Sequence, residues 1–359
     1  MSRETFKKII TSEQTSNAIC KENRSLITRF LKEKDRKCSD KTIYGYTSDL
    51  EIFFTWNYLY NDDKYFPEIK KIEFSDFFTF CVSELKWGSA RFGRMRSCVS
   101  GLADFIIKYY DEEFPSYRNF IKETIDAMPK VAARKKTVLK EEEVDGLLKW
   151  LISEDRHQEA CLLSLAITSG ARISELEQFT TDLIDENNVA FDGVFLETTD
   201  EIRTKGFGKE GHRMTKYIIK DEFLPIYKLW INQREELLSE CEEKNNFLFV
   251  TRSGKQASTQ TINRWVGSWE KKLGKDIYMH SLRHYFVTHL TRLGLSSDFI
   301  IEIMGWKSGD MYKIYNDLSA KDKKWKDTDI LKNAIKMFEV KRRSELPTTI
   351  YDSGFTHTI

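Results

Sequence analysis

The chain has 359 residues, of which 40% are hydrophobic and 13% aromatic, a composition that excludes a disordered protein. The formal net charge is only +1, so the charge total identifies no partner, and any binding to nucleic acid requires a local cluster of lysine and arginine. The scattered cysteines form no C-x-x-C pair, which argues against zinc and indicates a reducing compartment, and no apolar run is long enough to predict a membrane span.

Four stretches in the first third of the chain place apolar residues at helical spacing, and each predicts a helix. They span residues 24–37, 40–60, 74–86 and 89–110. Ser39 stands directly before the second stretch and is its expected N-cap. We therefore predict a helical domain over residues 21–126, preceded by an N-terminal extension of residues 1–20.

The segment of residues 127–140 is basic, contains proline and has no apolar face, so it is predicted to link two domains. Helical periodicity resumes over residues 158–168, 258–272 and 280–293. Residues 189–220 instead alternate around a glycine-rich turn, which predicts the strands of a hairpin. Residues 141–320 are thus expected to form a second, mixed domain, and the predicted fold class is mainly α with a small β-sheet or hairpin.

The last segment, residues 321–359, follows the second domain and contains an amphipathic stretch over residues 326–340. The apolar residues of that stretch are Ile330, Leu331, Ile335, Met337 and Phe338. A helix with such a pattern packs its apolar face either on its own domain or on another surface, and the sequence leaves both arrangements open.

Two arginines lie in settings that favour phosphate binding. Arg172 in ITSGARISELEQF follows an apolar helix and a Gly-Ala turn, so we expect it at a helix start, where backbone N–H groups also favour an anion. His280 and Arg283 are three residues apart and share one face of a predicted helix. Arginine binds phosphate oxygens in pairs, and imidazole titrates near neutral pH. The alternative interpretations are a surface arginine and a pair of residues on a helix surface.

Further along the chain stand an indole and two phenols. Tyr315 follows Trp306 by nine residues, and Tyr312 lies one helical turn earlier. A phenol has an ordinary pKa of about 10, so it needs nearby cations or a base to attack at neutral pH. Lys205 in RTKG and Lys209 in GKE fall in the predicted hairpin turn. A half-buried aromatic side chain and a solvated hairpin tip are the alternatives.

Taken in chain order, these motifs resemble the active-site signature of the tyrosine recombinases, the family that includes the phage integrases. The resemblance is close over residues 141–320 and looser over residues 20–126. It implies a catalytic set of Arg172, Lys205, His280, Arg283, Trp306 and Tyr315, with Glu175 as a supporting residue. Lys209 is the alternative to Lys205 and Tyr312 the alternative nucleophile. Most members carry histidine at the position of Trp306, whereas Cre-like recombinases carry tryptophan, which donates an N–H but cannot shuttle a proton.

The resemblance implies a site-specific DNA recombinase that cleaves and rejoins strands through a 3′-phosphotyrosyl intermediate and needs neither metal nor cofactor. A helical core-binding (SAM-like) domain and the catalytic domain would close around double-stranded DNA as a C-shaped clamp. Four protomers would assemble on two DNA sites and exchange strands through a Holliday junction, with accessory DNA-bending proteins as further partners. Candidate DNA contacts are Lys41, Arg91, Arg94, Arg96, Lys130, Arg134, Lys135 and Lys136.

Other functions are compatible with the same residues. A type IB topoisomerase or a telomere resolvase would share the chemistry, and a DNA-binding regulator would keep the fold without catalysis. For the basic clusters, a solvated face is the alternative to a DNA contact. The expected setting is the bacterial cytoplasm, in a host or in a phage or other mobile element.

Overall fold

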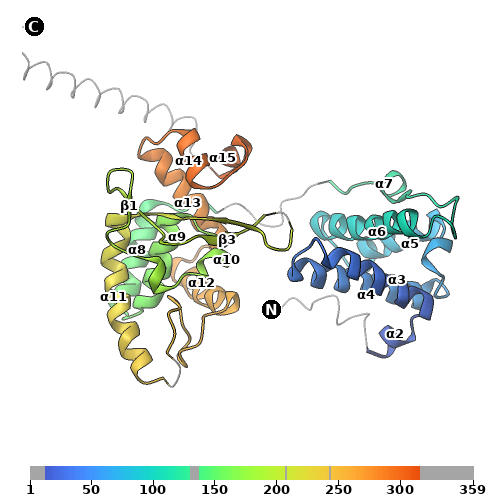
Figure 1. Ribbon diagram of the computed structural model, residues 1–359, viewed down its shortest axis with the longest axis horizontal. Helices are drawn as coiled ribbons and strands as arrows, with labels where there is room; N and C mark the ends of the chain where they lie inside the picture. The colour runs from blue at the N-terminus through green and yellow to red at the C-terminus, as the bar shows by residue number, and fades with distance from the viewer. Residues whose placement is uncertain (1–12, 130–136, 207, 242–243, 316–359) are drawn as a thin grey trace, which may run out of the picture. The chain divides into compact units, whose positions relative to one another are not determined.

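The computed structural model describes residues 13–129, 137–206, 208–241 and 244–315, which divide into two compact units (Figure 1). The first unit is Met1–Lys135 together with Lys205–His212, and the second is Lys136–Thr204 together with Arg213–Ile359. Within these described ranges, none of the helices has both the length and the apolar character of a transmembrane span.

The first unit is a helical bundle with a phenylalanine-rich core. It contains α2 (Glu13–Ala18), α3 (Lys21–Asp35), α4 (Asp40–Tyr60), the 3-10 helix η1 (Phe66–Glu68), α5 (Lys71–Ser83), α6 (Ser89–Tyr109) and α7 (Ile121–Thr124). Phe53 of α4 is fully buried and packs against Phe74 and Phe77 of α5, with ring centroids 5.7 and 4.9 Å away. Such aromatic pairs add to the free energy gained from burial alone.

The four helices predicted in this unit are confirmed, and two of them begin at the predicted residue. The expected N-cap residue, Ser39, is confirmed. Ser39 does occupy the N-cap position of α4, but its side chain makes no capping bond to the backbone. Its hydroxyl oxygen instead lies 3.0 Å from the Thr42 hydroxyl oxygen, because the two hydroxyl groups satisfy each other.

The second unit consists of helices that pack around α9, with small sheets at their edge. Its helices are α8 (Glu141–Ser153), α9 (His157–Ser169), α10 (Ile173–Leu176), the 3-10 helix η2 (Thr181–Leu183), α11 (Lys220–Ser239), α12 (Thr259–Leu273), α13 (Met279–Arg292), α14 (Ser297–Ile303) and α15 (Gly309–Tyr315). Every residue of α9 from Ala160 to Ser169 is buried. This explains why the segment is mostly apolar, and the hydroxyl groups of Thr168 and Ser169 are satisfied by backbone carbonyl oxygens one turn earlier in the helix.

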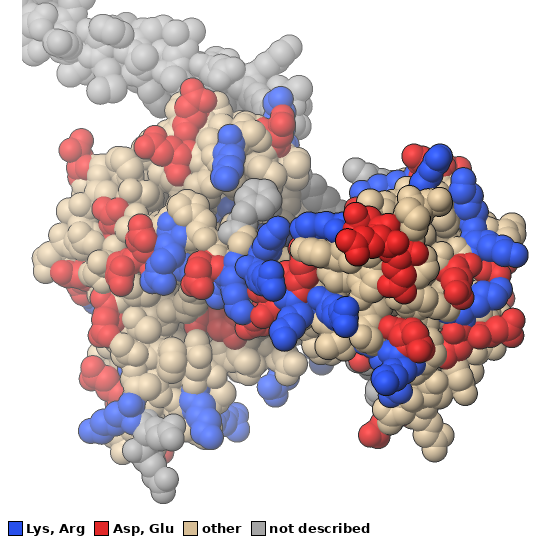
Figure 2. Space-filling view, turned by 45° about the vertical axis from the view of Figure 1, so that its right-hand side comes forward, with Lys and Arg blue, Asp and Glu red and all other residues tan. Residues whose placement is uncertain are grey.

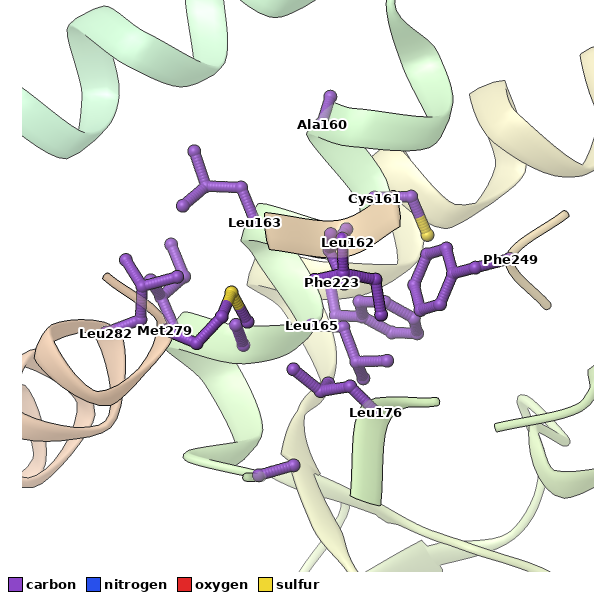
Figure 3. Packing of buried hydrophobic residues seen from close by; sticks show 14 of the residues in the cluster. Ala160, Cys161, Leu162, Leu163, Leu165, Leu176, Phe223, Phe249, Met279 and Leu282 are labelled. Carbon is purple, nitrogen blue, oxygen red and sulfur yellow. The ribbon is translucent and has the colours of Figure 1, made fainter. Parts of the chain in front are cut away.

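Figure 3 shows how the core around α9 is filled. Met279 and Leu282 of α13 approach α9 from one side, and Phe249 lies beside Cys161 on the other. Phe223 of α11, a helix that the sequence pattern did not predict, is fully buried in the same cluster. Helices α9, α11 and α13 thus form one hydrophobic core, which gives the site described below a rigid support.

The predicted strands are confirmed, although they are short. A three-stranded antiparallel sheet has the order β1 (Val189–Ala190), β2 (Phe195–Glu197), β5 (Tyr217–Ile219), and a separate hairpin pairs β3 (Ile202–Thr204) with β4 (His212–Met214). In the three-stranded sheet, Phe195 lies opposite Ile219, and both belong to a second buried cluster with residues of α13 and α14. The predicted fold class, mainly α with a small β component, is therefore confirmed.

Candidate active site

The first arginine of the predicted set lies at the start of a helix, as its motif indicated. Gly170 ends α9 in the left-handed conformation, with a φ of 60°, and Arg172 is then the N-cap of the short helix α10. The side chain of Arg172 is 24% exposed, so it is accessible to solvent in part. Its Nη1 donates hydrogen bonds to Glu175 over 2.7 Å and to Thr204 over 2.9 Å.

Glu175 is completely buried and collects donors from three elements. Its carboxylate accepts bonds from the backbone N–H of Arg172 at 2.9 Å, from the Arg172 guanidinium group and from the Thr204 hydroxyl. The fourth donor is the ammonium group of Lys216, at 2.9 Å. Burial alone would raise the pKa of Glu175, but Lys216, Thr204 and Arg172 together lower it to about 2. The carboxylate is therefore ionised at neutral pH and orients Arg172.

The second arginine is attached to the same turn that carries the first. Arg283 of α13 is 1% exposed, and its Nη1 donates a hydrogen bond to the carbonyl oxygen of Gly170. Its guanidinium carbon lies 5.5 Å from the centre of the Trp306 ring, within the range of a cation–π interaction. Arg172, Arg283 and Trp306 are thus brought together although they are distant in the chain.

His280 lies one turn before Arg283 on α13 and is exposed. The pKa of His280 is lowered to about 4. The largest cause is partial desolvation, and the positive charges of His284, Arg283 and Arg172 lower the pKa further. Its imidazole is therefore neutral at pH 7, in a form that has one N–H donor and one acceptor nitrogen.

Helix α15 carries both candidate tyrosines, Tyr312 and Tyr315. Tyr312 is half-buried, and its hydroxyl oxygen lies 3.1 Å from the Thr291 hydroxyl oxygen on α13. Thr291 is eight residues beyond Arg283, which corresponds to about 12 Å along a helix. Tyr315 is the last residue of α15, and its side chain lies outside the described part of the structure.

The two lysines proposed from the sequence are exposed in the segment between β3 and β4. Lys205 directly follows Thr204, the residue whose hydroxyl contacts both Arg172 and Glu175. Lys209 is four residues further along the turn.

Sequence reasoning missed Lys216, which the structure places in the arginine cluster. It directly precedes β5, and its side chain is only 4% exposed. A signal for this was present, because side chains alternate along a strand and Lys216 is two residues before the buried Ile218. Burial lowers the pKa of Lys216, Glu175 opposes this shift, and the positive charges of Arg283 and Arg172 add to it. The result is a concentration of positive charge suited to an anion.

The basic residues of the first unit have structural partners. Arg91 and Arg94 of α6 both bind Asp49, which is 1% exposed, at 2.6 Å. Arg96 donates to the carbonyl oxygen of Lys122 at 2.7 Å, and Lys41 is exposed at the start of α4. The linker residues Lys130, Arg134, Lys135 and Lys136 lie outside the described residues, as do residues 316–359 with the amphipathic stretch. Figure 2 shows basic and acidic side chains intermixed over the face that it presents.

A metal has no evident position in the described part of the chain, where histidine, cysteine and carboxylate side chains do not gather into a group of three or more. The side chains that do gather are two arginines, a lysine and one carboxylate, which neutralises only part of their positive charge. Such a group binds an oxyanion through charge and hydrogen bonds and stabilises the extra negative charge that a phosphate acquires on attack.

The sequence and the fold are both similar to those of known DNA recombinases and integrases. The sequence model of the phage integrase family matches residues 137–322. A tyrosine recombinase of Thermosipho africanus (strain TCF52B) is 24% identical over 292 residues, which cover 80% of this chain and 92% of that protein.

Two solved structures resemble the fold. The Tn1549 transposon integrase in complex with circular intermediate DNA has a TM-score of 0.61 at 15% identity, covering 85% of this chain and 98% of that one. A lambda integrase tetramer bound to a Holliday junction has a TM-score of 0.59 at 17% identity, covering 82% and 77%. At these identities the structures support the fold, and the family match carries the relationship.

Proposed function

The chain belongs to the phage integrase family and is a site-specific DNA recombinase, and we propose that Arg172 and Arg283 clamp the phosphate that Tyr315 attacks. The observation that carries this proposal is the hydrogen bond from Arg283 to the carbonyl oxygen of Gly170, because it joins the two arginines through one turn. Paired guanidinium groups neutralise the charge that develops on a phosphate during attack.

The reaction that we propose is a transesterification, in which the energy of the cleaved phosphodiester bond is kept in a bond between the tyrosine and the phosphate. The Tyr315 oxygen forms a bond to phosphorus, the bond from phosphorus to the 5′ oxygen breaks, and a 3′-phosphotyrosyl link results. His280, neutral at pH 7, accepts the phenol proton, and Lys205 donates a proton to the leaving 5′ oxygen. The 5′ hydroxyl of the partner strand then attacks the phosphotyrosyl link and releases Tyr315. Trp306 donates its indole N–H to a phosphate oxygen.

Two choices within this set are supported by contacts. The Tyr312 hydroxyl is engaged by Thr291, well along α13 from Arg283, which favours Tyr315 as the nucleophile. Thr204 contacts Arg172 and Glu175, and Lys205 is the next residue in the chain, which favours Lys205 over Lys209.

We propose the domain organisation and the partners on the same basis. A core-binding domain over residues 21–126, a linker over 127–140 and a catalytic domain over 141–320 would close on double-stranded DNA as a C-shaped clamp, with Lys41, Arg91, Arg94 and Arg96 as phosphate contacts. The tetrameric, Holliday-junction-bound state of lambda integrase supports a homotetramer on two DNA sites. The segment of residues 321–359, which lies outside the described residues, would dock either on a neighbouring protomer or on its own domain. Accessory DNA-bending proteins would assist, and the gene would belong to a bacterial host or a mobile element.

Covalent trapping tests this proposal. The protein is expressed with the DNA that flanks its own gene, the complexes are denatured in SDS, and the attached DNA is sequenced. Wild type is compared with Tyr315→Phe and Tyr312→Phe. An adduct that only Tyr315→Phe abolishes supports the proposal and identifies the target site.

Three other outcomes would point elsewhere. Loss of the adduct only in Tyr312→Phe would show that Tyr312, and not Tyr315, is the nucleophile. Absence of an adduct from wild type, with a nicked suicide substrate as well, would indicate a DNA-binding regulator. A second experiment incubates the protein with two target duplexes that carry different labels. A recombinase joins the two labels in one product, whereas a type IB topoisomerase or a telomere resolvase does not.

A further inference from the structure

Lys216 is a buried cation at the site that the proposed reaction does not use. Its backbone is fixed beside β5, where its N–H donates to the Thr198 hydroxyl at 2.9 Å and its carbonyl oxygen accepts from the Thr198 N–H at 2.9 Å. The side chain extends to Glu175, with its ammonium nitrogen 2.9 Å from Oε2, and only 4% of it is exposed. A lysine in such a position is unusual, because burying an ammonium group carries a large desolvation cost.

The charges around Glu175 indicate what the buried ammonium group of Lys216 does at the site. If Arg172 were the only cation bound to the buried carboxylate, the two charges would cancel and Arg172 would attract a phosphate weakly. Lys216 binds the other oxygen of the same carboxylate, so a cationic charge remains in excess. Arg283 adds another positive charge nearby, and its repulsion is one of the effects acting on Lys216.

We propose that Lys216 is a positioning residue for strand cleavage, which balances Glu175 so that Arg172 keeps its positive charge for the scissile phosphate. The proposal rests on the proposed function above. It assigns the role to the charge of Lys216 and not to its volume or to its hydrogen bond with the carboxylate. The stored repulsion among Lys216, Arg172 and Arg283 is relieved when the phosphate binds, which makes the site complementary to a dianionic transition state.

The test uses the full-length protein and a nicked suicide duplex of the sequence recovered by trapping. Single-turnover cleavage at saturating DNA is measured for wild type, Lys216→Met and Lys216→Gln, with thermal unfolding as the check on folding. Lys216→Gln can retain a hydrogen bond to Glu175 but has no charge. Lys228→Met is the matched control, because Lys228 forms a 2.8 Å ion pair with Glu186 on the exposed surface of the same unit.

We expect both Lys216 variants to cleave roughly 10²-fold more slowly than wild type, with little change in DNA affinity, and Lys228→Met to match wild type. The decisive variant is the double substitution Lys216→Met with Glu175→Gln. It removes one charge of each sign, so it should cleave at least about tenfold faster than Lys216→Met alone. If Lys216 only stabilised the fold, the folded protein of the single and of the double variant would cleave at the wild-type rate.

The acid limb of the pH profile gives a second readout. Lys216 is the foremost of the interactions that lower the pKa of Glu175, so in Lys216→Met the pKa of Glu175 should rise and cleavage should be lost at a higher pH than in wild type. If neither single variant folds, the double variant is compared with Glu175→Gln, and equal rates would overturn the proposal. Cleavage by folded Lys216→Met at the wild-type rate, or a double variant no faster than Lys216→Met, would also overturn it. Failure of wild type to cleave would instead count against the proposed function.

Discussion

The ring of Phe286 lies against the α-carbon of Gly170, on the side where any other residue would carry its Cβ. Gly170 also has a φ of 60°, so two independent constraints require glycine at the turn that leads to Arg172. The Phe286 ring is rigid and buried at 1% exposure, and it cannot move aside as a flexible side chain would. The position of Arg172 therefore depends on a residue two positions earlier.

We expect Gly170→Ala to lower the free energy of unfolding by about 2–4 kcal/mol, because it combines backbone strain with overpacking. Chemical denaturation measures the change. The matched control is Gly146→Ala in α8, where a Cβ meets nothing within 4 Å and alanine should stabilise the helix by about 0.5–1 kcal/mol. Equal stability of the two alanine variants would show that the turn at Gly170 relaxes freely.

Replacement of either arginine by lysine should reduce cleavage without abolishing DNA binding. Lysine keeps the charge but cannot form the paired hydrogen bonds of a guanidinium group, so Arg172→Lys and Arg283→Lys should each cleave about 10²–10³-fold more slowly. Single-turnover cleavage of the suicide duplex provides the rate, and filter binding provides the affinity. Arg252→Lys, at an exposed position before α12, is the control. A lysine variant that retains the wild-type rate would remove that arginine from the phosphate clamp.

The pKa of His280 makes stability depend on pH in a defined direction. In the folded state the pKa is lowered to about 4 from an ordinary value of 6.5, so the unfolded chain binds the proton more readily between these limits. The contribution of His280 to stability is therefore complete above pH 6.5 and falls as the pH decreases toward 4. His280→Gln should flatten this part of the stability profile.

The same histidine should respond to DNA. A bound phosphate places negative charge near the imidazole and favours its protonated form, so the pKa of His280 should rise in the complex. NMR titration of the imidazole signals, with and without a duplex bound to the Tyr315→Phe variant, measures both values. An unchanged titration midpoint on binding would mean that His280 does not face the phosphate.

How far the sequence predicts this protein depends on the kind of signal. Helix α4 was predicted at its observed bounds because its apolar residues are spaced regularly and turns flank it. Arg172 and Arg283 were singled out as candidates because short motifs surround them, and the structure joins them through the carbonyl oxygen of Gly170. Lys216 was missed because a lysine normally faces water; the alternation with Ile218 indicates its burial, but only the chain fold brings Glu175 within 2.9 Å of it. Local pattern therefore predicts elements and motifs, whereas pairs of buried charges depend on tertiary contacts.

In the first unit, Asp49 separates a structural role of the basic residues from a role in DNA binding. Arg94 binds Asp49 through two bonds of 2.9 and 2.6 Å, and Arg91 binds the same carboxylate. We expect Asp49→Asn to cost about 1–3 kcal/mol of stability, because it leaves buried donors of Arg91 with a poorer partner. Lys41→Ala should leave stability unchanged but lower the slope of log affinity against log salt by about 0.9. Unchanged salt dependence in Lys41→Ala would exclude that lysine from the phosphate contacts.

The pairing of Tyr312 with Thr291 gives a prediction that is independent of catalysis. Tyr312→Phe removes one partner of this hydrogen bond and should cost about 0.5–1.5 kcal/mol of stability, and so should Thr291→Val. The Thr291 hydroxyl also donates to the carbonyl oxygen of Val287 at 2.7 Å, a bond that Thr291→Val removes as well. Because both single variants break the bond between the two hydroxyl groups, the double variant should cost less than the sum of the two, and the difference measures their coupling. Urea denaturation of wild type, the two single variants and the double variant gives the four free energies of unfolding that this double-mutant cycle requires. Strict additivity would show that the Tyr312 hydroxyl is not held by Thr291 in solution, and it would restore Tyr312 as a competitor of Tyr315 for the phosphate.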